Sequence, residues 1–319
     1  MARYLLRRTA FLLGSLLLAA SLLFVLLRLL PGDPANALLS IGATPEQIAA
    51  ARRQTGSDLP LPEQFGAWLG GLARLDLGTS YVSKLPVGGE IAARLVVTVP
   101  LTLLAFALAV VVAVPVGFLA AHRAQRWYGP LLSGFAQLGI AVPVFWIGML
   151  LVTVFALRLR LLPAGGFPRE DWAEPGRALA ALTLPVVTIA LVMSASLIRY
   201  VRSATLDVLG SDHLRTARAL GESFAGAMWR HGLRNAAGPV IAVLGIELAT
   251  TFLGAVVVES VFALPGLGTL LIEGISEHDY PVIQGVLAVS TFAVLVIGFA
   301  ADVAQRLVDP RLRTRLGRS

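Results

Sequence analysis

Six apolar runs, each long enough to cross a membrane, constrain this chain of 319 residues more than any other feature. A helix rises ~1.5 Å per residue, so about 20 apolar residues span a hydrocarbon core of ~30 Å. The runs cover about residues 9–30, 95–121, 131–157, 178–198, 240–258 and 282–300. Because 56% of the residues are hydrophobic and only 14% are charged, a soluble globular fold is excluded. We therefore expect an all-α, polytopic integral membrane protein with six transmembrane helices.

The first apolar run could be mistaken for a secretory signal peptide, because Arg3, Arg7 and Arg8 precede it. A signal peptide has an apolar stretch of about 7–15 residues and a cleavage site of small residues. The run over 9–30 is longer, and the sequence PGDP at 31–34 that follows offers no such site. We interpret it as a retained first span.

The polar segment 31–94 contains two helix signals. Thr44 precedes Pro45 and Glu46, which is typical of a helix start with its acid in the first turn. Residues 64–75 could form a second, amphipathic helix.

The distribution of Lys and Arg between alternate loops predicts the orientation, because cytoplasmic loops carry an excess of these residues. Segments on the side of the N-terminus contain 16 Lys and Arg, and segments on the opposite side contain 9. The acidic residues are distributed the other way, 5 against 13. Six spans with both termini in the cytoplasm satisfy this count, which also places the loop 211–239 in the cytoplasm.

The loop 211–239 has the pattern of two short amphipathic helices. Ser211 or Asp212 can cap the first helix, and Gly221 stands where a left-handed residue would end it. Ser223 can begin the second helix, which we expect to end before Pro239. The second helix would carry Trp229, Arg230, His231 and Arg234. Helices of this kind on a membrane surface can present side chains to a cytoplasmic partner.

The spacing within this loop resembles the EAA loop of ABC-transporter permeases of the dipeptide, oligopeptide and nickel import family. The resemblance rests on RTARALG at 215–221, RHGLRN at 230–235 and the proline at 239. It departs from the family pattern at Leu220, where the family has lysine, and at Gly232, where it has alanine. In that family the loop inserts into a groove on the ATPase subunit. The resemblance implies an ATPase-coupling role for Arg215, Ala217, Arg218, Ala219, Gly221, Arg230, His231, Arg234 and Asn235.

Other segments extend the resemblance from end to end. They are PGDPA at 31–35, LDLGTSY at 75–81, ESVFALPGLG at 259–268, DYPVIQG at 279–285 and DPRLR at 309–313. The family implies the type I ABC importer permease fold in the cell membrane of a prokaryote. It implies three parts: 1–94 with the N-terminal tail, first span and extracytoplasmic segment; a permease core at 95–308; and a basic cytoplasmic tail at 309–319.

The resemblance implies a permease subunit of an ATP-driven, binding-protein-dependent importer, with dipeptides or oligopeptides as the expected substrates. Nickel or a metal chelate stays open as an alternative substrate, since such importers share these motifs. The implied partners are a second homologous permease, two ATP-binding cassette ATPases, an extracytoplasmic solute-binding protein and membrane lipid. Nucleic acid is not expected, because the basic residues are scattered between apolar spans.

The sequence contains no motif for a phosphate-binding P-loop of its own. A phosphate-binding P-loop needs Gly-Lys followed by Ser or Thr, whereas the only lysine, Lys84, lies between Ser83 and Leu85. There is no cysteine, and the four histidines fall on both sides of the predicted membrane. We therefore expect no enzyme, no metal site and no cofactor in this chain, with the ATPase on a separate polypeptide.

Glu247 is the one acid that the sequence places inside a predicted span. A charged side chain at mid-membrane costs about 2.5–3.5 kcal/mol on insertion scales, so it should face a partner or a wet cavity. A residue of the translocation path and an interhelical hydrogen-bonding residue are both open interpretations.

Two other classes of function are open alternatives. A self-sufficient channel or secondary transporter would need ion-coupling acids and often repeated halves. A structural membrane protein would leave the spacing over 215–239 unexplained.

Overall fold

The computed structural model describes residues 2–29, 43–124, 126–127, 134, 139 and 141–308, except the side chains of Ala2, Gln54, Leu233 and Arg234. The regular elements in this part of the chain are helices, and Thr79 and Pro86 form an isolated β-bridge. In chain order they are α1 (Ala2–Leu29), α2 (Pro45–Thr55), α3 (Leu61–Ala73), α4 (Val87–His122), α6 (Val144–Leu151), the π-helix η2 (Val152–Arg158), α7 (Pro175–Leu209), α8 (Asp212–Ala219), α9 (Phe224–Ala227), the π-helix η3 (Met228–Gly232), α10 (Leu233–Val261), α11 (Leu267–Glu277) and α12 (Tyr280–Val308).

Five helices are long and apolar enough to cross a membrane, which agrees with five of the six predicted spans. The candidate spans are Arg3–Leu29, Val87–His122, Pro175–Leu209, Asn235–Val261 and Tyr280–Val308. Their helices extend beyond the apolar runs, because a helix can continue for several polar turns outside the hydrocarbon core. The all-α polytopic fold is confirmed.

The predicted span over 131–157 is only partly described. The described part ends in a shorter apolar helix, Val144–Arg158, in which α6 continues into η2. Most of the first half of this predicted span lies outside the described residues. The count of six spans is therefore approximate.

The core of the protein lies where α4 crosses α7. On α4, small and apolar residues recur every four positions at Leu101, Ala105, Ala109 and Ala113, all fully buried. They pack against a face of α7 formed by Leu182, Leu184, Ile189, Ala190, Met193, Leu197 and Ile198. Small residues allow two membrane helices to approach closely, and packing attraction then replaces the hydrophobic effect as the driving force.

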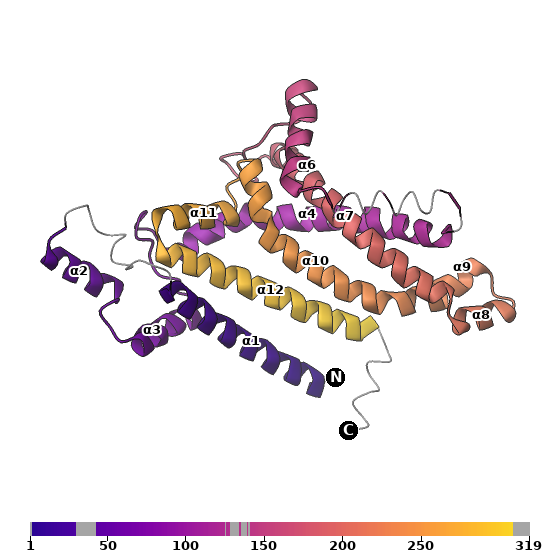
Figure 1. The fold of residues 1–319 in the computed structure, drawn as a ribbon, viewed down its shortest axis with the longest axis horizontal. Coiled ribbons are helices and arrows are strands. Elements are labelled where there is room, and N and C mark those ends of the chain that lie inside the picture. The colour runs from indigo at the N-terminus through magenta and orange to yellow at the C-terminus, as the bar shows by residue number, and fades with distance from the viewer. Residues whose placement is uncertain are drawn as a thin grey trace.

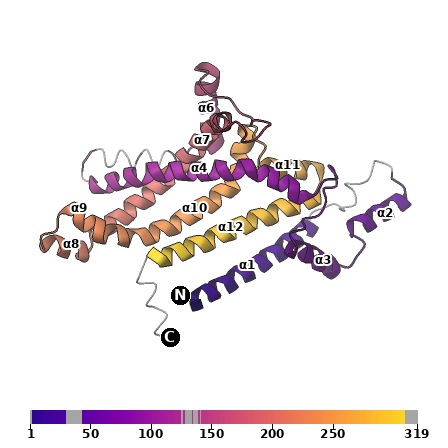
Figure 2. The same cartoon turned by 180° about the vertical axis from the view of Figure 1, so that it is seen from behind.

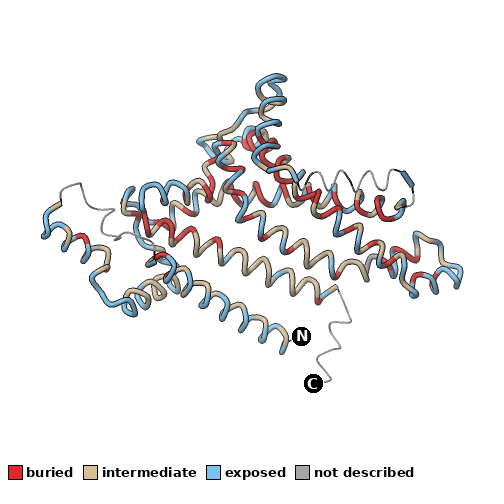
Figure 3. Tube along the Cα trace, viewed as in Figure 1, coloured by how far each residue is buried: buried red, intermediate tan, exposed pale blue. Residues whose placement is uncertain are grey.

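Helix α1 lies along α12 at the periphery and runs antiparallel to it (Figures 1 and 2). Arg8 pairs with Asp302 at 2.6 Å, and the Arg306 guanidinium lies 3.9 Å from the centroid of the Tyr4 ring. The start of α1 is therefore beside the end of α12. Most other side chains of α1 are exposed or intermediate (Figure 3), as expected for a helix that faces lipid on the remaining sides.

The short helices outside the spans gather at two opposite ends of the molecule. Helices α8 and α9 lie at one end, and α2, α3 and α11 lie at the other (Figure 1). This separation agrees with the alternation of loops on which the sequence-based topology rests.

The two helices predicted in segment 31–94 are present. Thr44 caps α2 through a capping box, in which its hydroxyl accepts from the Gln47 N–H and the Gln47 side chain accepts from the Thr44 N–H. The second helix begins at Leu61, three residues earlier than predicted. Pro62 does not prevent this start, because proline is tolerated in the first turn of a helix.

Candidate functional site

The first short helix of the 211–239 loop, α8, is held by an apolar face. Leu214 and Ala217 are buried against Val208 of α7 and against Ala227 and Met228 of the second helical segment. Ser211 occupies the N-cap position, but its side chain makes no capping hydrogen bond and donates to the Val208 carbonyl instead. The prediction that the Ser211 side chain caps the helix is therefore wrong, although the helix begins at the predicted position.

Gly221 ends α8 as predicted, in the left-handed region at φ 89°. The Gly221 N–H donates to the Arg218 carbonyl at 3.1 Å, and the Glu222 N–H donates to the Ala217 carbonyl at 3.2 Å. These two bonds form a Schellman motif, which satisfies carbonyls that would otherwise lack partners at the helix end. The motif fixes the reversal between α8 and α9.

The second helix starts as predicted but does not stop as predicted. The Ser223 hydroxyl accepts from the Gly226 N–H at 3.1 Å and caps α9. Then α9, η3 and α10 follow one another without a non-helical residue, and Pro239 lies inside α10. The prediction that Pro239 separates a surface helix from a span is wrong, because a membrane helix can tolerate proline where neighbours satisfy the freed carbonyl. Arg234 lies in the first turn of α10, and its side chain is outside the described part of the chain.

A stack of rings anchors this loop to the end of α4. The Arg218 guanidinium lies 5.7 Å from the centroid of the Phe224 ring. Phe224 stacks on His122 with centroids 4.8 Å apart, and His122 stacks on Phe118 at 5.9 Å. The loop is thus attached to α4 as well as to α7 and α10, so it has a defined position relative to three helices that cross the membrane.

The outer face of the loop is exposed and combines cationic with apolar side chains. Its exposed residues include Arg215, Arg218, Ala219, Leu220, Trp229 and Arg230. Leu220 is 81% exposed and Trp229 is 76% exposed. Exposed apolar side chains surrounded by charges are typical of a protein contact surface.

The remaining predicted coupling residues hold the loop together. Glu222 lies 3.8 Å from Arg230 and 3.5 Å from His231. The Asn235 amide donates to the His231 carbonyl at 2.7 Å and lies 3.1 Å from the His213 ring. Exposed pairs of this kind contribute about 0–1 kcal/mol each, so they orient the side chains more than they stabilise the fold.

Glu247 has both a partner and a cavity. The Ser196 hydroxyl donates to its carboxylate at 2.6 Å, which links α7 to α10. The same carboxylate lines a cavity of about 260 Å³ with Met193, Thr250, Thr251 and other residues of α6, α7 and α10. The two interpretations of Glu247 are therefore compatible within one structure.

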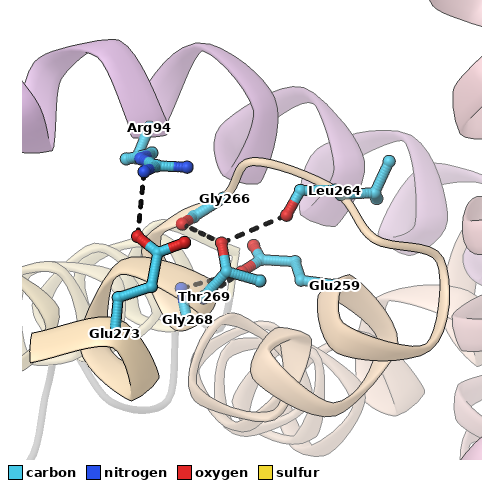
Figure 4. Close-up of polar contacts among 7 residues, drawn as sticks. All are labelled: Arg94, Glu259, Leu264, Gly266, Gly268, Thr269 and Glu273. Atoms are coloured by element: carbon cyan, nitrogen blue, oxygen red, sulfur yellow. Dashed lines mark hydrogen bonds and ion pairs between the residues drawn. The ribbon is translucent and has the colours of Figure 1, made fainter. Parts of the chain in front are cut away.

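The structure identifies a second acid, Glu259, that the sequence did not place inside a span. It lies in the last turn of α10 and is fully buried. Its carboxylate accepts from the Gly268 N–H at 2.7 Å (Figure 4) and from the Thr269 N–H at 3.3 Å. It also accepts from the Thr98 hydroxyl at 2.6 Å. Glu259 lies one residue beyond the predicted apolar run 240–258, in the end of α10 that continues past this run, so Glu247 stays the one acid inside a predicted span.

A third acid, Asp279, organises the loop before α4 and is 2% exposed. Its carboxylate accepts from the Ser80 hydroxyl at 2.5 Å and from the N–H groups of Tyr81 and Val82 at 3.1 and 3.3 Å. Glu259 and Asp279 both belong to segments whose sequence resembles the permease family. That resemblance was the available signal, but it did not reveal that the two acids hold the fold.

Comparison with known proteins identifies the family. Residues 113–314 match the family described as binding-protein-dependent transport system inner membrane component, and residues 1–102 match the N-terminal family of the same transport systems. The chain belongs to this family. The resemblance that rested on the 215–235 spacing is confirmed, and this multi-pass membrane protein is a transporter subunit and not an enzyme.

Relatives of known name match almost the whole chain. One is a protein of Brucella abortus (strain 2308) whose name assigns it to a peptide transport system as permease, with 38% identity over 98% of this chain and 99% of that protein. Another is the glutathione transport system permease protein GsiC of Salmonella typhimurium (strain LT2), with 37% identity over 98% of this chain and 99% of that protein.

Among solved structures, the fold is similar to that of the MetNI methionine ABC transporter in inward-facing conformations. The TM-score is 0.56 at 18% identity, covering 68% of this chain and 95% of that chain. The likeness confirms the ABC importer permease fold. Membership of a binding-protein-dependent ABC importer family implies an ATPase and a substrate-binding protein as partners.

Proposed function

We propose that this permease forms half of the translocation pathway of an ATP-driven importer of short peptides. Two relatives that match nearly the whole chain support the substrate class, since their names assign them to peptide and glutathione transport. In the proposed assembly the permease pairs with a second homologous permease, two ATP-binding cassette ATPases and an extracytoplasmic binding protein. It carries no cofactor of its own.

The observation that carries this proposal is the helical reversal at Gly221. It leaves the side chains of Arg215, Arg218, Leu220 and Trp229 exposed on the protein surface, at the end of the molecule formed by α8 and α9. Because α8 packs on α7 and α9 continues into α10, a displacement of this surface would move the ends of two long helices. The loop 211–239 is therefore the proposed contact with the ATPase.

The orientation we propose has both termini and the α8–α9 loop in the cytoplasm. The excess of Lys and Arg on these segments supports it. The Arg8–Asp302 pair also supports it, since it brings the start of α1 beside the end of α12. Helices α2, α3 and α11 then lie outside, where a binding protein docks.

The proposed mechanism is alternating access driven by the ATPases. ATP-dependent closure of the ATPase pair draws the two coupling loops together and opens the central cavity outward. A ligand shifts such an equilibrium only by its differential affinity for the two states, so the driving free energy comes from the ATPase contacts. Glu247 lines the path in this proposal, with its carboxylate held by Ser196.

Co-purification and uptake test the proposal together. The tagged permease should bring down an ATPase subunit from detergent-solubilised membranes, and the assembled importer should take up labelled dipeptides or glutathione in an ATP-dependent way. A chain that transports without any ATPase would be a channel or secondary transporter. ATP-dependent uptake of nickel or a metal chelate, without uptake of peptides, would refute the substrate class.

A further inference from the structure

A single unbroken helical path leads from the proposed ATPase contact to the opposite face of the molecule. It starts at Phe224 in α9, passes through η3 and ends at Val261, the last residue of α10 (Figure 1). At ~1.5 Å per residue this path is longer than the ~30 Å hydrocarbon core. A movement at its cytoplasmic start can therefore be transmitted to its outer end within one continuous helical segment.

The outer end of this path holds the first turn of α11 through Glu259. The first N–H groups of a helix have no partners within the helix, and the helix dipole favours a negative charge there. Glu259 supplies both an acceptor for these N–H groups and a carboxylate at the helix start, because its side chain accepts from the Gly268 N–H (Figure 4) and from the Thr269 N–H. Gly266 makes room for this contact, since a side chain at that position would collide with the Glu259 carboxylate.

Thr98 of α4 completes the junction. Its hydroxyl donates to Glu259 at 2.6 Å and accepts from the Leu267 N–H at 2.8 Å. The start of α11 is thus bound to α10 and α4 by three buried or partly buried hydrogen bonds, and a fourth joins Thr98 of α4 to Glu259 of α10. Because a buried carboxylate without its donors is strongly destabilised, these groups are expected to move together.

The other end of α11 is also held. The Asp279 N–H donates to the Gly274 carbonyl at 2.8 Å, while the Asp279 side chain holds the loop around Ser80 that leads into α4. Between these two attachments, α11 exposes Ile272 and Ile275, at 44% and 55%. Because α11 is held at both ends, it can move as a rigid body when α10 moves, and its exposed apolar face would move with it.

We propose that Glu259 is the positioning residue that fixes α11 to the end of α10, so that movement of the ATPase-coupling loop displaces α11 on the extracytoplasmic face. This inference rests on the proposed function, because it names the helix, α11, through which the effect of ATP binding would reach the extracytoplasmic side, where the binding protein docks. Glu259 touches no substrate in this role, and it acts through α11.

Two reporter positions test the inference in the complete importer. The chain contains no cysteine, so a cysteine placed at Ile275 on α11 or at Asp212 on α8 is the only one in this subunit. Asp212 has a side chain 97% exposed. With an environment-sensitive fluorophore at either site, the assembled complex in lipid nanodiscs should show a change at both reporters when ATP and vanadate are added.

Glu259→Gln replaces one carboxylate oxygen, which accepts hydrogen bonds, by an amide NH2 group, which donates them. This donor would face either the backbone N–H groups of α11 or the Thr98 hydroxyl, so at least one hydrogen bond would be lost. We expect the response at α8 to persist and the response at α11 to fall about fivefold, the effect on an equilibrium of losing one typical hydrogen bond. Thr98→Val should act in the same direction, and Thr98→Ser should restore the response. Glu273→Gln is the matched control, because Glu273 is an acid of α11 itself that is 53% exposed and pairs with Arg94 at 3.0 Å (Figure 4).

An undiminished α11 response in Glu259→Gln and Thr98→Val would overturn the inference. If Glu259→Gln fails to assemble, the comparison of Thr98→Val with Thr98→Ser decides alone. If the labelled protein without a further substitution shows a fluorescence change at α8 but not at α11, the inference is also overturned, while the proposed function is not affected. Absence of any ATP response at α8 would instead refute the proposed function.

Discussion

The Ser196 hydroxyl donates a 2.6 Å hydrogen bond to the carboxylate of Glu247 and thereby joins α7 to α10 beside a cavity of about 260 Å³. A neutral hydroxyl is a sufficient partner for this side chain in either its charged or its amide form. A variant that keeps this hydrogen bond but lacks the charge can therefore show whether transport depends on the charge of Glu247 or only on its shape.

Glu247→Gln keeps the acceptor for Ser196 and removes the charge. We expect normal assembly and peptide uptake within about threefold of the reference, equivalent to ~0.7 kcal/mol. Glu247→Ala should cost about 1 kcal/mol of stability or more, because it deletes the hydrogen bond and enlarges the cavity. Uptake kinetics and thermal unfolding in detergent measure both effects. Loss of uptake in a well-assembled Glu247→Gln complex would mean that the charge itself acts in transport.

Gly221→Val should disconnect the coupling loop. The cost comes from the backbone, since φ is 89° and no atom lies within 4 Å of the position that a Cβ would take. A left-handed residue with a Cβ costs roughly 1–2 kcal/mol. We expect normal insertion and a loss of substrate-stimulated ATP hydrolysis by the complex. Gly221→Asn is the control, because asparagine tolerates this conformation, and it should retain more stimulation than valine does.

Arg218→Glu reverses a charge on the exposed face of α8. The contact of Arg218 with Phe224 is exposed and is worth about 0.5–1 kcal/mol, so the fold should survive. Stimulated ATP hydrolysis should fall strongly, because an acid would meet the surface to which the cationic loop binds. Arg177→Glu, at an exposed position near the start of α7, is the matched control and should leave stimulation unchanged. Equal effects of the two variants would argue against α8 as the contact surface.

The absence of cysteine also allows a direct test of orientation. A membrane-impermeant maleimide should label Ile275→Cys in spheroplasts. It should label Asp212→Cys only after the membrane is permeabilised. Labelling of Asp212→Cys in intact spheroplasts would contradict a cytoplasmic α8.

Gly117→Ala should destabilise the crossing of α4 and α7. The new Cβ would lie 2.8 Å from the Val201 Cβ and 2.9 Å from the Ile198 carbonyl oxygen, too close for either helix to stay in place. Overpacking of this kind typically costs about 1–3 kcal/mol, which would appear as a lower thermal midpoint in detergent. Gly14→Ala on α1 is the control, because, apart from its chain neighbours and the adjacent backbone of α1, no described atom lies within 4 Å of its Cβ position. A lower midpoint in both variants would mean that the close helix crossing is not the cause.

The sequence predicted the local features well where one segment decides them. The helix start at Thr44-Pro45-Glu46, the left-handed Gly221 and the start of α9 at Ser223 depend on residues within one turn, and each was found. Pro239 misled the prediction, because the neighbours of a membrane helix decide whether a proline ends it. Likewise, apolar length identified five spans but placed most of their ends inside the helices.

Hydrophobic length predicted the polytopic α-fold, since the membrane requires enough apolar residues in each span separately, and motif spacing predicted the family. The contacts of the buried acids, in contrast, depend on how distant helices pack together. Glu259 is buried because Thr98, 161 residues away, and the first turn of α11 supply its donors, and Glu247 is held because Ser196 on another helix donates to it. Whether a buried carboxylate is tolerated depends on donors brought to it by folding, and no local pattern in the sequence records where those donors will lie.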